Sequence, residues 1–335
     1  MIYSQKDITQ KNLSKELDLI AKRSDCSNVN DMLYFPKYFQ IETVRKCNEN
    51  CIFCPKDKWD NSVPYMSDKL FEKIAEELKA YSDWITVVDL QRNGEPLLDK
   101  NLPEKVLRLK KSGIKCVNFS TNASLLSEKL AKRLLDAGLD EIMLSIDTIN
   151  KEKYETMRVG LNFDKVMNNI LTFFDLREKM KPDMIIRIRG VSFFDLNTPE
   201  DRNALKEWEN FWEPYRKPHD RIYMKRAHNW GNQKNIDGYQ KNPDVFHPCI
   251  LPWSTMHIMS KGLVTICPHD YNGKMNIGDV NTNTMKEVWN DKKINNIRNL
   301  HKTGKRNDIP LCKQCVTFDL DYNMENLDIM DENKS

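Results

Sequence analysis

Short runs rich in β-branched and aromatic residues alternate with longer amphipathic runs over residues 39 to about 227, and this alternation constrains the fold most. Strands separated by helices of this length pair in parallel through right-handed crossovers. The expected strands are 39–45, 85–91, 114–121, 141–146, 184–192 and 221–226. The expected helices are 68–80, 102–111, 127–137, 163–180 and 200–211, with Ser67 and Ser127 as N-caps. The sequence therefore predicts an α/β fold whose chemistry lies at the carboxyl ends of parallel strands.

Composition excludes several classes of function. Lys and Arg number 52 against 49 Asp and Glu, and no long basic run is present, so nucleic acid is not the expected partner. No apolar run is long enough to span a membrane, and no secretory signal is visible, so we expect a soluble, cytoplasmic protein without a membrane partner. Nine cysteines in such a chain indicate metal binding more than disulfides.

A first group of cysteines directly follows the first expected strand. Cys47, Cys51 and Cys54 lie on one short loop, with Phe53 just before the last of them. Cubane iron–sulfur clusters usually take four thiolates, so a loop with three leaves one iron open to an external ligand. A zinc knuckle that lacks its fourth ligand is the alternative, but a position at the end of a strand favours a reactive site.

A second group of cysteines lies in the last third of the chain. It consists of Cys249, Cys267, Cys312 and Cys315, of which the last two form a Cys-x-x-Cys pair. Four thiolates saturate either an iron–sulfur cluster or a zinc ion. Between the first two, a turn at Lys261-Gly262 joins two short β-rich runs, 256–259 and 263–266, and predicts a hairpin. Helices are expected near 285–290 and 293–301.

Polar residues also stand where the expected strands end. Gly94 and Glu95 follow the second strand; the glycine lets the backbone approach a ligand closely, and the glutamate can accept a hydrogen bond from an ammonium group. The third and fourth strands each end in two polar residues on one face, Ser120 with Asn122 and Ser145 with Asp147.

The Cys-x-x-x-Cys-x-x-Cys spacing, with an aromatic residue before the last cysteine, resembles the signature of the radical S-adenosylmethionine (SAM) superfamily. The resemblance implies a partial (βα)6 TIM-like barrel and a [4Fe–4S] cluster whose open iron binds the methionine part of SAM. Asn93-Gly94-Glu95-Pro96 resembles the family's Gly-Gly-Glu-Pro segment, and 144–147 resembles its segment for the ribose and carboxylate. Cofactor contacts are thereby implied at Phe53, Gly94, Glu95, Ser120, Asn122, Ser145, Asp147 and Arg158.

The second cysteine group, with Gly262 and the segments 276–280 and 288–290, resembles the auxiliary-cluster modules called SPASM and, in shortened form, twitch. Full SPASM modules carry further cysteines, and none follows Cys315, so the resemblance implies a single auxiliary [4Fe–4S] cluster held by four thiolates. Without an open iron, such a cluster is suited to carrying electrons. The expected units are an N-terminal extension (1–38), the barrel (39–227), a bridge (228–248), the SPASM/twitch module (249–323) and a disordered acidic tail (324–335).

The one-cluster arrangement resembles 2-deoxy-scyllo-inosamine dehydrogenase and related enzymes that act on carbohydrates and aminocyclitols. It implies that a 5′-deoxyadenosyl radical removes hydrogen from a secondary alcohol, which becomes a ketone while the auxiliary cluster accepts an electron. The implied partners are a small carbohydrate-like substrate and a flavodoxin- or ferredoxin-type electron donor. The implied catalytic residues are Asn93, Arg226 and His269, and further substrate contacts are expected at Gln91, Arg187, Arg189, Lys225, His228 and Asp270.

Three alternatives remain open. Epimerisation of a sugar carbon requires a hydrogen-atom donor, usually a thiol, and the unassigned cysteines are Cys26, in a polar stretch, and Cys116, which we expect to be a small buried residue. A peptide maturase usually carries an N-terminal recognition domain and a two-cluster module, and the stretch before residue 39 is short for such a domain. A simple electron carrier would need no SAM-binding segments.

Overall fold

The computed structural model describes residues 10–192, 198–235 and 247–315; the expected tail and part of the expected bridge lie outside them. Its centre is one nine-stranded sheet in the order β11-β10-β9-β1-β3-β4-β5-β7-β8. The last six strands of that order run parallel and form the barrel, as expected. They are β1 (Tyr38–Ile41), β3 (Val87–Asp89), β4 (Cys116–Thr121), β5 (Glu141–Ser145), β7 (Ile185–Ser192) and β8 (Arg221–Arg226).

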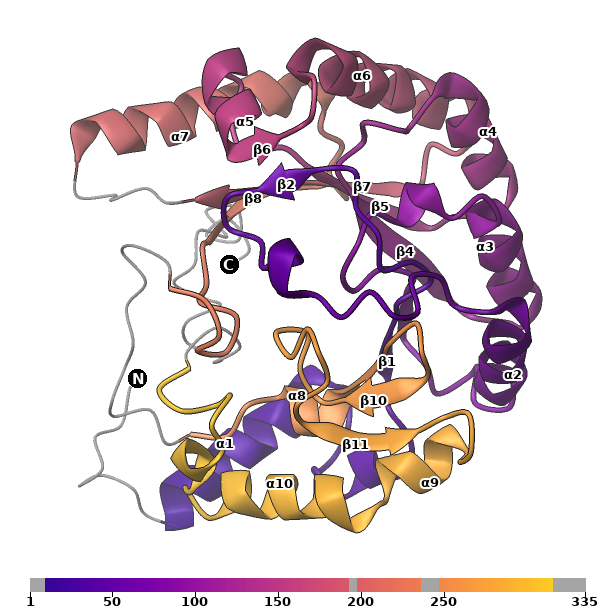
Figure 1. The fold of residues 1–335 in the computed structure, drawn as a ribbon, viewed down its shortest axis with the longest axis vertical. Helices are drawn as coiled ribbons and strands as arrows, with labels where there is room; N and C mark the ends of the chain where they lie inside the picture. The colour runs from indigo at the N-terminus through magenta and orange to yellow at the C-terminus, as the bar shows by residue number, and fades with distance from the viewer. Residues whose placement is uncertain (1–9, 193–197, 236–246, 316–335) are drawn as a thin grey trace.

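Helices form an outer arc around these strands (Figure 1). They are α2 (Asp68–Lys79), α3 (Leu102–Lys111), α4 (Glu128–Asp136), α6 (Phe163–Met180) and α7 (Pro199–Trp212). The two expected N-caps are confirmed, because the hydroxyl of Ser67 accepts a hydrogen bond from the Leu70 amide and that of Ser127 from the Leu130 amide. Short elements that were not expected are α5 (Lys151–Met157) and the two-stranded pair β2 (Asn50–Cys51) and β6 (Arg158–Val159).

Alternation along the strands gives the barrel one apolar and one polar face. Toward the helices, β7 buries Ile186 and Ile188, which belong to the main hydrophobic core. On the opposite, inner face the same strand carries Arg187 and Arg189, both partly buried. Since strand residues alternate in direction, the apolar set holds the helices onto the sheet and leaves a polar inner face free for chemistry.

The C-terminal module continues the barrel sheet. The expected hairpin is confirmed as β9 (Thr255–Ile258) and β10 (Leu263–Thr265), and β11 (Asn276–Asp279) pairs with β10. The sequence did not predict that β9 pairs in parallel with β1, so that one sheet passes from barrel to module. The helices of the module are α8 (Leu251–Ser254), α9 (Met285–Trp289) and α10 (Lys292–Lys302).

The N-terminal segment packs against this module. Helix α1 (Gln10–Arg23), which was not predicted, contributes Ile20 and Ala21 to a small second core around Trp253, and Figure 1 shows it beside α10. The indole nitrogen of Trp289 donates a 2.9 Å hydrogen bond to the carbonyl oxygen of Met32. The first and last parts of the described chain therefore stabilise each other.

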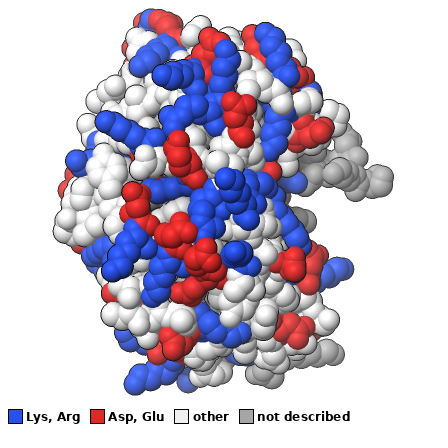
Figure 2. All heavy atoms as spheres, turned by 90° about the vertical axis from the view of Figure 1, so that its right-hand side faces the viewer, with Lys and Arg blue, Asp and Glu red and all other residues white. Residues whose placement is uncertain are grey.

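The face covered by α2, α3 and α4 carries charges of both signs, which Figure 2 shows interleaved. Some of them pair between neighbouring helices, as in Arg108–Glu72 and Arg133–Glu104, each at 2.5 Å. No helix in the described ranges has the length and apolar character needed to cross a bilayer.

Candidate functional site

The first three cysteines lie in the loop between β1 and α2, at the carboxyl end of the first barrel strand. Strand β2 fixes part of this loop, because Cys51 pairs in antiparallel register with Arg158. The ammonium group of Lys56 donates 2.7 Å hydrogen bonds to the carbonyl oxygens of Cys47 and Glu49. Backbone pairing with β6 and the hydrogen bonds of Lys56 therefore fix the conformation of this loop.

These thiols suit a positively charged centre. Burial raises the pKa of Cys47 and of Cys54 to about 12, and that of Cys51 further still. The charge of Cys54 contributes to the raised pKa of both other thiols, so the three share one neighbourhood. Buried thiolates without a counter-ion are unfavourable, and iron ligation removes that cost.

Gly94 lies where the segment after β3 approaches the first cysteine loop. Its φ is +83°, and a Cβ atom there would lie 2.5 Å from the carbonyl oxygen of Val44 and 2.8 Å from that of Lys46. The glycine therefore lets the strand end approach the cysteine loop, and the amide of Glu95 donates a 2.8 Å bond to Lys46. The close contact is with the loop that would hold the cluster.

The carboxylate of Glu95 is buried and surrounded by donors. Its oxygens accept hydrogen bonds from the Thr121 hydroxyl at 2.6 Å and from the Asn122 and Leu97 amides at 2.8 and 3.0 Å. Burial nevertheless outweighs these bonds and raises the pKa of Glu95 to about 7. The side-chain amide of Asn122 donates a 3.0 Å bond to the side-chain oxygen of Asn48, which joins this strand end to the cysteine loop.

Arg158 links the end of β5 to the cysteine loop. Its guanidinium makes two bonds to Asp147, at 2.6 and 3.1 Å, and lies 3.3 Å from both carboxylate oxygens of Glu49. It also lies 5.6 Å from the ring centre of Phe53. Burial alone would lower the pKa of Arg158, but the charges of Asp147 and Glu49 raise it well above its ordinary value. Ser145, two positions before Asp147, has its hydroxyl 3.3 Å from that of Ser120.

The four auxiliary cysteines also gather in one place. Burial, followed by the charges of Cys312, Cys315 and Cys249, raises the pKa of Cys267 well above its ordinary value. Among the described residues, no three Cys, His, Asp or Glu side chains are placed to hold a single ion. Four thiolates brought together in this way could hold an iron–sulfur cluster.

Family comparisons agree with this geometry. A model of the Radical SAM superfamily matches residues 41–196, and a model of an iron–sulfur cluster-binding domain (SPASM) matches residues 249–316. An uncharacterized protein of Methanocaldococcus jannaschii is 30% identical over 214 residues, which are 63% of this chain and 68% of that protein. The chain belongs to the radical SAM superfamily. Enzymes of this family bind SAM and a [4Fe–4S] cluster, and the SPASM module binds auxiliary iron–sulfur clusters.

Other relatives match this radical SAM chain over less of their length. A probable GTP 3′,8-cyclase of Methanococcus maripaludis is 35% identical over 133 residues, 39% of this chain and 43% of the cyclase. The match thus spans less than half of that relative.

Solved structures share the fold. BtrN in complex with AdoMet and 2-DOIA superposes with a TM-score of 0.57 at 19% identity, covering 84% of this chain and 93% of BtrN. SuiB of Streptococcus suis bound to precursor peptide SuiA gives a TM-score of 0.62 at 15% identity, covering 86% and 71%. At these identities the likeness concerns the fold alone.

The inner face of this radical SAM barrel carries polar residues that the sequence analysis missed. Asp89, on β3, accepts bonds from the Gln91 amide at 2.9 Å and the Gln40 side chain at 3.4 Å. Burial raises the pKa of Asp89 to about 7. Glu141 accepts from Asn118 at 3.0 Å and pairs with Arg187 at 2.6 Å. Polar residues at alternate positions of expected strands were the available signal.

Two of the expected substrate residues have other contacts. The side-chain nitrogen of Asn93 donates a 3.0 Å bond to the carboxylate of Glu42, which is fully buried. The carboxylate of Asp270 accepts backbone bonds from Lys274 and Met275, at 2.8 and 2.7 Å, and so shapes a turn. Asn93 is thus tied to the boundary between barrel and module.

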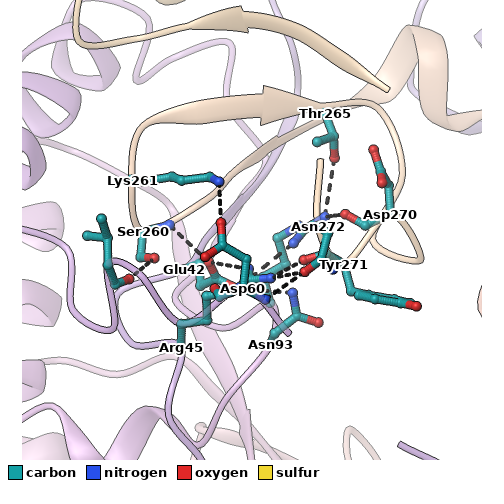
Figure 3. Close-up of polar contacts among 12 residues, drawn as sticks. Glu42, Arg45, Asp60, Asn93, Ser260, Lys261, Thr265, Asp270, Tyr271 and Asn272 are labelled. Atoms are coloured by element: carbon teal, nitrogen blue, oxygen red, sulfur yellow. Dashed lines mark hydrogen bonds and ion pairs between the residues drawn. The ribbon is translucent and has the colours of Figure 1, made fainter. Parts of the chain in front are cut away.

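That boundary contains a buried polar network, shown in Figure 3. Arg45 pairs with Glu42 at 3.0 Å, and its guanidinium also reaches the Asn272 side chain at 2.9 Å. The amide of Ser260, in the hairpin turn, donates a 2.9 Å bond to Glu42. The guanidinium of Arg92 donates a 3.3 Å bond to the carbonyl oxygen of Cys267. Since Arg92 also lies 3.9 Å from Glu42, one network joins the segment that follows β3 to an auxiliary cysteine.

Of the other residues expected near a substrate, Arg226 and His228 lie where β8 leads into the bridge, and His269 packs against His228. Arg226 ends β8, in register with Ser192. The imidazoles of His228 and His269 stack with ring centres 3.8 Å apart. The side chain of Gln233 donates a 2.9 Å bond to the carbonyl oxygen of His269, so His269, two positions after Cys267, lies against the start of the bridge.

The start of the bridge joins the two cysteine loops directly. The indole nitrogen of Trp230 donates a 2.8 Å bond to the Phe53 carbonyl oxygen, and Lys234 donates to the carbonyl oxygens of Ile52 and Cys54, each at 2.8 Å. The side chain of Asn232 donates a 2.8 Å bond to the Lys313 carbonyl oxygen, next to Cys312. We call residues 228–235 the clamp segment.

Proposed function

We propose that this radical SAM enzyme oxidises a secondary alcohol of a small carbohydrate- or aminocyclitol-like molecule to a ketone. The observation that carries the proposal is the polar inner face of the barrel, where Asp89 has a pKa of about 7 and Gln40 and Gln91 hold its carboxylate. A hydroxyl-rich substrate matches such a face. A general base is most effective when its pKa lies near the working pH.

Each part of the site has a task in this reaction. Cys47, Cys51 and Cys54 would hold the first cluster, and the four auxiliary thiolates the second. When bound, SAM and the first cluster would supply the radical chemistry that removes hydrogen from the substrate carbon, and the second cluster would provide an acceptor for one electron. Glu95 would accept a bond from the amino group of SAM, and Asp89 would take the hydroxyl proton.

The supporting partners follow from the chemistry. The first cluster needs an electron from outside, for which we propose a small flavodoxin- or ferredoxin-type donor, and we place the reaction in the cytoplasm. Asn93, Arg226 and His269 remain proposed contacts near the substrate, with Asn93 acting through Glu42.

Anaerobically reconstituted protein should contain about eight iron atoms, since two cubanes hold four each. Replacing Cys47, Cys51 and Cys54 by alanine should halve the iron content and abolish 5′-deoxyadenosine formation.

Replacing Cys312 by alanine should still permit SAM cleavage but prevent the ketone from forming. Cys26→Ala is the matched control and should keep both clusters. SAM cleavage by the triple variant would refute the site assignment.

Epimerisation is the second candidate, and the partial exposure of the Cys116 thiol favours it. The sequence suggested a buried residue, whereas Cys116 is partly exposed and lies on the inner face, two positions before Asn118. It stands at the amino end of β4, however, away from the strand ends that carry the cofactor residues. A redox-neutral product with deuterium from heavy water, lost in Cys116→Ala, would establish the epimerase and exclude the dehydrogenase.

A further inference from the structure

The arginines on the inner face of β7 differ in how their charges are balanced. Arg187 pairs with Glu141 at 2.6 Å. Arg189, two positions further toward the carboxyl end, donates a 3.2 Å bond to the neutral hydroxyl of Ser120. Within the described ranges, no carboxylate lies at ion-pair distance from Arg189. A partly buried guanidinium that lacks a counter-ion is unfavourable, and an anionic ligand would supply the missing charge.

A second cation lies on the neighbouring strand. Lys225 of β8 pairs in register with Val191, two positions beyond Arg189, so both cations are near the carboxyl ends of their strands. Burial and then the charges of Lys225 and Arg189 lower the pKa of His228 to about 3. The imidazole therefore lies close to both cations and stays neutral beside them.

This basic region is part of the site proposed for the substrate. Arg189 is in register with Ser145 of the proposed SAM-binding segment and with Tyr223 of β8. Its charge also acts on Asp89, whose pKa it lowers against the larger effect of burial. One small molecule can therefore reach both the proposed base and the cations.

We propose that the substrate carries an anionic substituent, a phosphate or a carboxylate, that binds to Arg189 and Lys225 where β7 and β8 end. The planar guanidinium can bind two oxygens of such a group, and the ammonium adds a point charge. The inference rests on the proposed function and narrows it from neutral sugars to acidic or phosphorylated ones. Arg158 already has two carboxylate partners, so it is less available for a further anion.

Binding of simple anions to the reconstituted enzyme tests the proposal without any turnover. The enzyme is saturated with SAM under anaerobic, non-reducing conditions and titrated calorimetrically with inorganic phosphate and, separately, with acetate. We expect at least one probe to bind in the millimolar range or tighter, and the tighter one identifies the class of anion. Arg189→Gln should weaken that binding by about tenfold or more.

Arg187→Gln is the matched control, because it removes the same charge from the same face of the same strand. We expect it to leave anion affinity within about threefold, since its charge is already balanced by Glu141. Arg189→Lys should restore part of the affinity, which keeps the test valid if the glutamine variant folds poorly.

Three results would overturn the inference. They are the absence of binding by either probe, equal losses in the two glutamine variants, and a loss of SAM affinity in Arg189→Gln with anion binding unchanged. The last would assign Arg189 to the cofactor. If the enzyme oxidises a neutral sugar but binds neither anion, the proposed function stands and the present inference is wrong. If it binds an anion through Arg189 but forms no ketone from any substrate, the present inference stands and the proposed function is wrong.

Discussion

Asp89 lies on the inner face of the barrel, and burial raises the pKa of its carboxyl group to about 7. Only the ionised form can accept a proton from a substrate hydroxyl. The same raised pKa means that folding favours the protonated form. Activity and stability should therefore depend on pH in opposite directions at this single residue.

The activity of the enzyme should rise with pH to about 7 and then level off, because Asp89 becomes ionised over that range. Asp89→Asn should lower kcat by on the order of 10²- to 10⁴-fold and remove the acid limb of the profile. The measurement is ketone formation from pH 5.5 to 8.5. An unchanged acid limb in the variant would assign the base to another group.

Stability should follow the opposite trend. The folded-state pKa of Asp89 is raised, so its stabilising contribution is complete below its unfolded-state pKa and is lost as pH rises through about 7. The free energy of unfolding of the wild type should therefore fall, relative to Asp89→Asn, as the pH rises from about 4 to about 8. Urea denaturation of both proteins at several pH values measures this difference, and parallel curves would contradict it.

Arg158 should contribute to stability, because the carboxylates of Asp147 and Glu49 are buried around it. Arg158→Gln leaves two buried carboxylates without their cationic partner and should lower the free energy of unfolding by about 3–5 kcal/mol. Arg133→Gln, which breaks the exposed pair with Glu104, should cost less than about 1 kcal/mol. Similar losses of unfolding free energy in both variants would contradict the view that burial of the ion pair sets the size of the effect.

At the scale of elements, the clamp segment places a cation against the first cysteine loop. Lys234 bonds to the carbonyl oxygens of Ile52 and Cys54, and its charge lowers the pKa of the Cys54 thiol against the larger effect of burial. A nearby cation favours the more negative, reduced cluster.

Lys234→Met should therefore shift the midpoint potential of the first cluster to a more negative value by on the order of 50 mV. Lys234→Arg should retain most of the wild-type potential. The measurement is a redox titration followed by electron paramagnetic resonance. Equal potentials in wild type and Lys234→Met would show that the segment acts through backbone contacts alone.

Most elements could be predicted because their signals are local. Alternation within a strand, a serine before an apolar periodic run and Lys261-Gly262 between two β-rich runs each depend on residues close in sequence. The pairing of β1 with β9 had no such signal, since Gln40 and His257 are 217 positions apart. Glu49 was missed as the partner of Arg158 for the same reason, because 109 positions separate them.

At the scale of the whole molecule, β9 covers the edge of β1, which pairs with β3 on its other side. A chain that ends at residue 248 would leave the backbone groups of that edge unpaired and open to other chains.

Such a truncated protein should aggregate on expression, as judged by size-exclusion chromatography of the soluble fraction. Full-length protein with Cys312 and Cys315 replaced by alanine is the matched control, because it loses auxiliary ligands but keeps β9. We expect this control to remain monodisperse. A soluble, monodisperse truncated barrel would show that the module is not needed to cover β1.

The β1–β9 pairing also means that β1 is synthesised well before the strand that covers its second edge. Translation adds roughly 5–20 residues per second, so His257 would leave the ribosome on the order of 10–40 s after Gln40, given the 217 positions between them. During that interval β1 has its β3 neighbour and an uncovered second edge. Until β9 is made, that edge is open to other chains, and the first cysteine loop can meet the auxiliary module only after Cys312 and Cys315 have been synthesised.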